Sequence, residues 1–178
     1  MSKLKVLITG AAGQVGSHVA ELMLARGDTV LGVDDFTTGR PEHLPPESAN
    51  YMFREGSIAD ADFVNRAFGE FLPDVVVHTA ASYKDPEDWY SDALTNVVGS
   101  VNVIKASKTA QIKRFIYFQT ALCYGRPESV PIPVSLRAAP FTSYGISKTA
   151  GEQFLAMGPV PVVSLRLANV SGPRLAIG

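Results

Sequence analysis

Short runs of valine, isoleucine and other strand-forming residues alternate with longer segments of helical periodicity along most of this chain. Several runs are apolar throughout, as expected of strands whose two faces are both covered by helices. The alternation predicts an α/β domain with a doubly wound parallel sheet. The expected strands are 5–8, 29–33, 51–54, 75–78, 114–118 and 162–167, and the expected helices are 14–26, 60–70, 92–110 and 144–157.

Two segments do not fit this alternation. Residues 37–50 are rich in proline, glutamate and glycine and indicate an exposed loop. Residues 125–143 contain four prolines and form a long connection between a strand and a helix. Long loops in compact domains usually serve function, so the second segment is expected near a functional site.

The composition fits one globular domain and argues against several kinds of partner. Of the 178 residues, 46% are hydrophobic, enough for a sizeable core. Sixteen basic residues balance seventeen acidic ones without a block of like charge, so neither nucleic acid nor an anionic membrane is expected as a partner. The apolar stretch 6–8 is too short for a secretion signal, and no run approaches the roughly 18 apolar residues of a membrane helix. The single cysteine, Cys123, cannot form an internal disulfide, which favours a reducing, cytoplasmic location.

The histidines do not indicate a metal centre. His18, His43 and His78 are widely separated in the sequence, and no metal site is expected. His78, at the end of an expected strand, is interpreted as a structural histidine. Trp89 and Tyr90 are expected to anchor a loop or the start of a helix.

A glycine-rich turn joins the first expected strand to the first expected helix. Gly10, Gly13 and Gly16 follow the spacing G-x-x-G-x-x-G. Glycine is needed where the chain turns sharply and where backbone approaches a diphosphate, and the helix N-terminus then presents free N–H groups to the anion. Taken alone, the triplet fits an ordinary strand–helix turn equally well.

An acidic residue at the end of the second expected strand strengthens the nucleotide interpretation. Asp34 follows Gly16 by eighteen positions, close to the spacing at which a carboxylate meets the adenosine ribose hydroxyls. A carboxylate there accepts from the 2′-hydroxyl and repels a 2′-phosphate, so NAD is expected rather than NADP. Asp35 is the neighbouring alternative, and a strand-end acid can also be simply solvated.

A tyrosine and a lysine one helical turn apart carry the predicted chemistry. Tyr144 and Lys148 share one face of the expected helix. The ammonium, helped by a positively charged nicotinamide, is expected to lower the pKa of the phenol so that it takes a proton from a substrate hydroxyl. An isolated Tyr-x-x-x-Lys pattern is common on exposed helices, and only the nucleotide-binding half before it gives the pair significance.

Thr120 ends the fifth expected strand, at the sheet edge where ligands bind in open parallel sheets. Its hydroxyl is expected to hydrogen-bond the reacting oxygen near Tyr144. The alternative is that the hydroxyl only satisfies the backbone at the end of the strand.

Together these segments resemble the extended short-chain dehydrogenase/reductase superfamily, in its NAD-dependent epimerase/dehydratase branch, from Lys5 to Arg174. Residues 78–86 and 119–126 are similar to bacterial epimerase-like enzymes of surface-polysaccharide (O-antigen) biosynthesis. The resemblance implies a Rossmann-type fold and NAD as cofactor. It also implies a homodimer formed through the helices expected from Asp92 to Ala110 and from Tyr144 to Met157, although the same apolar positions could face the sheet.

The resemblance implies a role for individual positions. Ser57 stands where the family often has aspartate at the adenine edge, so this contact is expected to be weaker. The catalytic residues implied are Thr120, Tyr144 and Lys148. The cofactor-binding residues implied are Gly10, Gly13, Gln14, Val15, Gly16, Asp34, Ser57, Ile58, Ala80, Ala81, Asn96, Tyr144 and Lys148. Substrate is implied to contact Thr120 and Asn169, the latter near the phosphates of a nucleotide-sugar.

Two departures from the family pattern refine the expected reaction. Dehydrating and decarboxylating relatives carry acidic residues directly after the catalytic threonine, whereas Ala121 and Leu122 stand there and cannot transfer a proton. Epimerisation of a nucleotide-sugar such as a UDP-sugar, at C4, by oxidation and hydride return remains possible. The alternatives are a nucleotide-sugar dehydrogenase or reductase and a non-catalytic NAD-binding module. Extended members also continue past this segment, so residues 1–178 are interpreted as the cofactor-binding domain without a C-terminal substrate domain.

Overall fold

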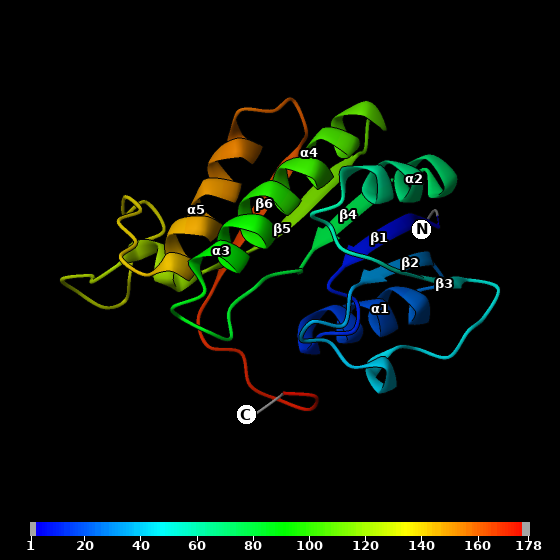
Figure 1. Cartoon of the computed structure of the whole chain (residues 1–178), viewed down its shortest axis with the longest axis horizontal. Helices are drawn as coiled ribbons and strands as arrows, with labels where there is room; N and C mark the ends of the chain where they lie inside the picture. The colour runs from blue at the N-terminus through cyan, green and yellow to red at the C-terminus, as the bar shows by residue number, and fades with distance from the viewer. Residues whose placement is uncertain (1–2, 176–178) are drawn as a thin grey trace.

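The computed structural model describes residues 3–175 and contains one six-stranded, fully parallel sheet with the strand order β3-β2-β1-β4-β5-β6 (Figure 1). The predicted α/β doubly wound fold is confirmed. The strands are β1 (Lys5–Thr9), β2 (Thr29–Asp34), β3 (Tyr51–Glu55), β4 (Val75–His78), β5 (Arg114–Thr120) and β6 (Val162–Leu167). The α-helices are α1 (Gln14–Ala25), α2 (Ala61–Phe71), α3 (Trp89–Asp92), α4 (Ser100–Thr109) and α5 (Ser143–Ala156).

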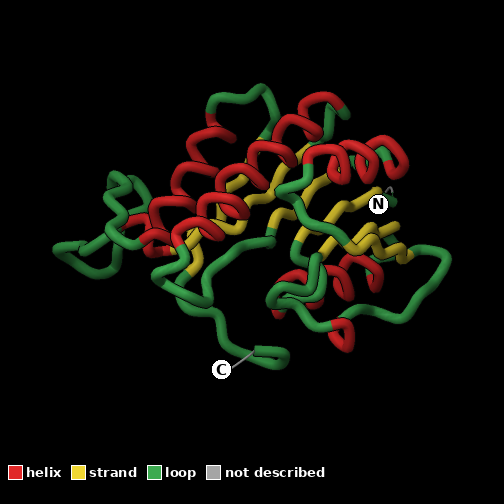
Figure 2. Tube along the Cα trace, in the orientation of Figure 1, coloured by secondary structure: helices red, strands yellow, loops and turns green. Residues whose placement is uncertain are grey.

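Helices cover both faces of the sheet, as Figure 2 shows with helices in red around the yellow strands. One apolar core lies on the face with α2, α4 and α5 and includes Leu7, Phe68 and Phe115. The other lies under α1 and includes Ile8 and Ala20. Neighbouring residues of β1 therefore enter opposite cores, which explains why this strand is apolar throughout.

The register of the central strands sets the position of the functional edge. Thr9, the last residue of β1, pairs with Val33 on one side and with His78 on the other. The carboxyl ends of β1, β2 and β4 are thus level, and the loops that follow them meet at one edge. His78 is fully buried between the hydroxyls of Thr9 (2.6 Å) and Ser100 (2.9 Å), which confirms the prediction of a structural histidine.

Two predicted elements differ from the structure. The helix expected to begin at Asp92 begins at Trp89, and a π-helical segment, Ala93–Gly99, connects α3 to α4. Trp89 and Tyr90 do start this helix, and the indole N–H of Trp89 donates to the carbonyl of Pro86 at 3.1 Å, although both side chains are largely exposed. The loop 37–50 contains a single 3₁₀ turn, Pro41–His43, which begins with proline. Among residues 3–175, no helix combines the length and the hydropathy needed to cross a bilayer.

Candidate active site

A cleft of about 670 Å³ runs along the carboxyl ends of the strands, across the point where the chain order of the sheet reverses between β1 and β4. Open α/β sheets bind their ligands at this position. Thirteen of the expected site residues line the cleft: Gly10, Gly13, Gln14, Val15, Asp34, Ser57, Ile58, Ala80, Ala81, Thr120, Tyr144, Lys148 and Asn169. Gly16 and Asn96 are not part of the lining.

The glycine turn is packed so tightly that it excludes side chains. Gly10 has a φ of +72°, and a Cβ atom there would lie 2.7 Å from the backbone nitrogen of Ala80. A Cβ at Gly16 would lie 2.1 Å from the carbonyl oxygen of Gly10. Gly16 thus allows α1 to approach the turn and has no direct place in the cleft, a distinction that glycine spacing alone cannot make.

The N-terminus of α1 opens onto the cleft. Gly13 occupies the N-cap position without a side-chain cap, and the first turn contains no acidic residue. By contrast, Asp60 caps α2 and Thr142 caps α5 through their side chains. The free backbone N–H groups and the positive end of the α1 dipole can therefore receive an anion such as a diphosphate.

Asp34 lies at the other side of the turn, with both carboxylate oxygens held by backbone. Oδ2 accepts from the N–H of Ala12 and Oδ1 from the N–H of Phe36, each at 2.9 Å. Burial raises the pKa of this carboxyl, and the two backbone N–H groups oppose the shift. Each oxygen keeps a further lone pair, so the carboxylate can still accept from a ribose hydroxyl in the cleft. The neighbouring Asp35 is exposed and bonds the backbone of Thr37.

Asn96 lies behind the cleft and hydrogen-bonds two segments of the chain to each other. It is fully buried in the π-helical segment, its Oδ1 accepts from the N–H of Ser82, and its Nδ2 donates to the carbonyl of Ser82 and the hydroxyl of Ser147. Ser147 in turn donates to the carbonyl oxygen of Tyr144. Asn96 thus has the structural part of its expected role, as a link between the loop after β4 and α5, and its side chain does not line the cleft.

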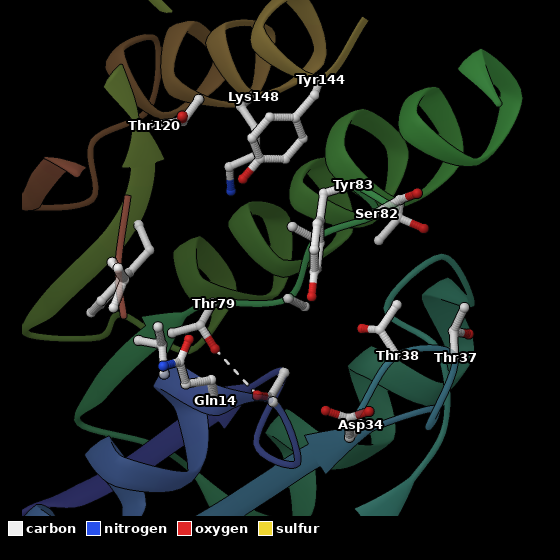
Figure 3. A pocket seen from close by; sticks show the side chains of 18 of the residues that line it. Gln14, Asp34, Thr37, Thr38, Thr79, Ser82, Tyr83, Thr120, Tyr144 and Lys148 are labelled. Atoms are coloured by element: carbon white, nitrogen blue, oxygen red, sulfur yellow. Dashed lines mark hydrogen bonds between the residues drawn. The ribbon is translucent and has the colours of Figure 1, made fainter. Parts of the chain in front are cut away.

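Tyr144 and Lys148 project from α5 into the cleft, as Figure 3 shows, with Thr120 beside them at the end of β5. Gln14 and Asp34 lie toward the opposite end of the same view. The structure thus brings together, in one cavity, the phenol and amine from α5 and the turn before α1. This arrangement can place a bound dinucleotide beside a proton-accepting group.

Burial shifts the pKa of both members of the pair. Burial raises the pKa of Tyr144 to about 12, with smaller contributions from Asp92 and Tyr83. Burial lowers the pKa of Lys148 to about 7, and its Nζ lies 4.2 Å from the centre of the Tyr117 ring. The expected lowering of the phenol pKa involves the ammonium together with a positively charged nicotinamide; in the protein alone, burial disfavours the charged form of both groups.

Thr120 is engaged by backbone in the way the alternative interpretation expected. Its Oγ1 accepts from the N–H of Leu122 at 3.2 Å and caps a 3₁₀ turn, Ala121–Tyr124. The hydroxyl hydrogen is not committed by this bond, so Thr120 can still donate to an oxygen in the cleft.

The part of the cleft around Thr120, Tyr144 and Lys148 is its reacting end. Two further residues line this end that were not predicted from the sequence. Tyr83, in the loop after β4, is half exposed, lines the cleft and places its ring 6.5 Å from that of Tyr144 at an interplanar angle of 63°. Gln119 also lines the cleft and is almost fully buried. In the sequence, Gln119 stands out only by its position at the end of β5 and Tyr83 only by its position in the segment after β4.

Residues 6–177 match the NAD dependent epimerase/dehydratase family. The chain belongs to this family. It is 33% identical to the UDP-glucose 4-epimerase of Mycolicibacterium smegmatis over 96% of its length and 58% of the relative's length. Azospirillum brasilense UDP-glucose 4-epimerase is 35% identical over 94% of this chain and 49% of its own. The chain therefore spans about half the length of these curated relatives.

The fold is also that of solved members of the family. The Bordetella bronchiseptica enzyme WbmG, solved in complex with NAD and UDP, is 60% identical with a TM-score of 0.95, over 99% of this chain and 57% of its own. Thermotoga maritima UDP-glucose 4-epimerase with UDP-glucose is 33% identical with a TM-score of 0.88, over 96% of this chain and 57% of its own. The predicted family is confirmed.

Proposed function

We propose that this chain is the cofactor-binding domain of an NAD-dependent nucleotide-sugar epimerase that acts on a UDP-sugar at C4. The observation that carries the proposal is the convergence of Tyr144 and Lys148 on the cleft that begins at the uncapped N-terminus of α1. Support also comes from the relatives, which are UDP-glucose 4-epimerases, and from the neighbours solved with NAD and UDP.

The residues of the cleft fit a dinucleotide with its diphosphate at the glycine turn. Gly10 and Gly13 leave room for the backbone to approach the diphosphate, while Asp34 accepts from the adenosine ribose. Ser57 and Ile58 lie at the adenine edge of the cleft, and Ala80 and Ala81 leave space along its wall. When bound, NAD supplies the hydride acceptor and a positive charge near the reacting end.

At the reacting end, the phenolic oxygen of Tyr144 accepts the proton of the sugar hydroxyl. Thr120 donates a hydrogen bond to the oxygen of that sugar hydroxyl and holds it in place. Lys148 orients the ribose of the cofactor. In its protonated form it also stabilises the phenolate, whose pKa is about 12 in the protein alone. Ala121 and Leu122 cannot transfer protons, so the chemistry stops at oxidation and hydride return without loss of water.

The test replaces Tyr144 by phenylalanine in the protein expressed from its complete reading frame. Turnover of a UDP-sugar should fall by about 10²–10⁴-fold, the usual contribution of a general base, while NAD remains bound. Tyr51→Phe is the control, because Tyr51 lies outside the cleft and its hydroxyl has no hydrogen-bond partner among the described residues. Unchanged turnover in Tyr144→Phe would refute the role, and net accumulation of NADH would indicate a dehydrogenase instead.

We also infer a homodimer formed through α3, α4 and α5. These helices lie side by side in Figure 1, and several apolar side chains on them are exposed. They are Trp89 and Tyr90 on α3 and Ile146 and Phe154 on α5, and Val98 is exposed in the π-helical segment between α3 and α4. Sedimentation should show a dimer that Ile146→Glu dissociates, and a monomeric wild-type protein at micromolar concentration would contradict the assignment.

A further inference from the structure

An ion pair outside the cleft is connected to the reacting residues. Glu152 lies on α5 one turn after Lys148, and its carboxylate accepts from Arg166 of β6 through both Nε (3.3 Å) and Nη2 (3.2 Å). It also accepts from the hydroxyl of Ser164 and from Nε2 of Gln119 at 3.2 Å. The two side chains of the pair are only 18% and 24% exposed, and neither lines the cleft.

This carboxylate determines which way the amide of Gln119 faces. A carboxylate only accepts hydrogen bonds, so the NH₂ group of Gln119 must face Glu152 and its oxygen must face away. The oxygen then accepts from the backbone N–H of Thr120 at 2.8 Å, while the same NH₂ group donates to the carbonyl of Lys148 at 3.2 Å. One buried amide thus links the end of β5 to the turn of α5 that carries the lysine.

Arg166 also hydrogen-bonds residues in the segment that follows Thr120. Its Nη1 donates to the hydroxyl of Tyr124 and to the carbonyl of Val134, both at 3.1 Å. Tyr124 ends the 3₁₀ turn that follows Thr120, and Val134 belongs to the long loop before α5. The charge pair therefore holds both the turn that follows Thr120 and the loop that precedes Tyr144.

Glu152 is ionised in this setting. Burial alone would raise the pKa of its carboxyl, but the hydrogen bonds from Ser164, Arg166 and Gln119 outweigh it and lower the pKa. The carboxylate therefore remains an obligate acceptor at neutral pH, as the orientation of Gln119 requires.

We propose that Glu152 and Arg166 form a positioning pair that, through Gln119, fixes the hydroxyl of Thr120 relative to Tyr144 and Lys148. The expected effect of the pair on turnover rests on the proposed function. The expected effect of the pair on the hydrogen bond between Gln119 and the Thr120 backbone does not. Neither residue contacts the reacting atoms, so both act through Gln119 and the strand end.

The structural part is tested by hydrogen exchange of the Thr120 backbone amide in Glu152→Gln. A glutamine can present either its oxygen or its NH₂ group to Gln119, so the orientation of that amide is no longer enforced. Exchange at Thr120 should accelerate by about tenfold or more as this hydrogen bond weakens, while the amide of Ile8 in β1 remains protected. Glu70→Gln is the matched control, because Glu70 pairs with Arg54 on the exposed surface. Unchanged protection of Thr120 in Glu152→Gln would overturn the proposal.

The catalytic part is tested by a double-mutant cycle in the protein from its complete reading frame. Glu152→Gln should lower kcat by about tenfold with KM unchanged, and the loss should largely disappear in a Thr120→Ala background, since residues that act through one contact are not additive. Equal losses in both backgrounds would show a general structural effect and contradict the proposal. Arg166→Lys, which retains the charge but not the two-pronged contact, should give an intermediate loss. A wild-type protein that epimerises no UDP-sugar would contradict the proposed function alone, because the exchange measurement needs no substrate.

Discussion

The two ends of the cleft are built in different ways. At the end near α1, backbone atoms provide the site: the glycine turn excludes side chains, and both oxygens of Asp34 are held by backbone N–H groups. At the end near α5, side chains provide it. Tyr144 and Lys148 enter from one helix, and Gln119 joins them to Thr120 and the ion pair behind it. The first end depends on close approach and the second on the correct orientation of polar groups.

This difference predicts different responses to substitution. A backbone-built site fails when a Cβ is added, because the backbone has no alternative position nearby. A side-chain network can relax, so its failure should appear first in turnover and only later in stability. Three comparisons of variants test this contrast, in order of decreasing expected effect.

Gly16→Ala should have the largest effect, at the backbone-built end. The added Cβ would lie 2.1 Å from the carbonyl oxygen of Gly10, so either the turn or α1 must move. We expect a loss of more than about 3 kcal/mol in the free energy of unfolding, together with loss of NAD binding. Denaturant titration and calorimetry measure both quantities.

Gly69→Ala is the matched control for that substitution. No atom of residues 3–175 lies within 4 Å of a Cβ at Gly69 in α2, so alanine should stabilise the protein by about 0.5–1 kcal/mol. If Gly16→Ala bound NAD normally, the glycine turn would not be the rigid part of the site.

Lys148→Met tests the burial of the amine at the reacting end of the cleft. The measured quantity is the free energy of unfolding as a function of pH. An unfolded lysine keeps its proton up to about pH 10.4, whereas burial lowers the pKa of Lys148 to about 7 in the folded chain. Between these values the unfolded state binds one more proton, so wild-type stability should rise with pH relative to Lys148→Met by up to about 1.4 kcal/mol per unit. Urea titrations of the cofactor-free proteins between pH 7 and 10 measure the difference. A difference that stays constant over this range would show that the amine is solvated.

Thr142→Ala and Asp60→Ala form the smallest and most selective comparison. Thr142 caps α5 by accepting from the N–H of Gly145, and Asp60 caps α2 by accepting from the N–H groups of Asp62 and Phe63. Each substitution should cost about 1 kcal/mol of stability. Only the loss at α5 should also reduce turnover, because that helix starts immediately before Tyr144. Similar turnover in the two variants would argue against a side-chain-built reacting end that is sensitive to small shifts of α5.

The sequence predicted the backbone-built end well. The strands carry unbroken apolar runs, and a glycine needed for close approach is visible as a residue type, so the turn at Gly10 and the acid at Asp34 could be placed from spacing. The level ends of β1, β2 and β4 follow from the parallel fold itself.

The reacting end was predicted only in part. Tyr144 and Lys148 share one helix, so their spacing shows that they lie together. The contacts of Gln119 with Glu152 and of Arg166 with Tyr124 join residues 33 and 42 positions apart, and no local pattern indicates them. The π-helical segment around Asn96 and the raised pKa of Tyr144 likewise arise from tertiary packing and burial.

The most direct test of the account follows the hydride itself. A UDP-sugar deuterated at C4 of the sugar is incubated with the NAD-loaded protein from its complete reading frame, and the product is examined by mass spectrometry and NMR. Hydride return within one cleft should give an epimerised sugar that retains the deuterium at C4, with no net NADH. Deuterium lost to water, or left on accumulated reduced cofactor, would contradict it.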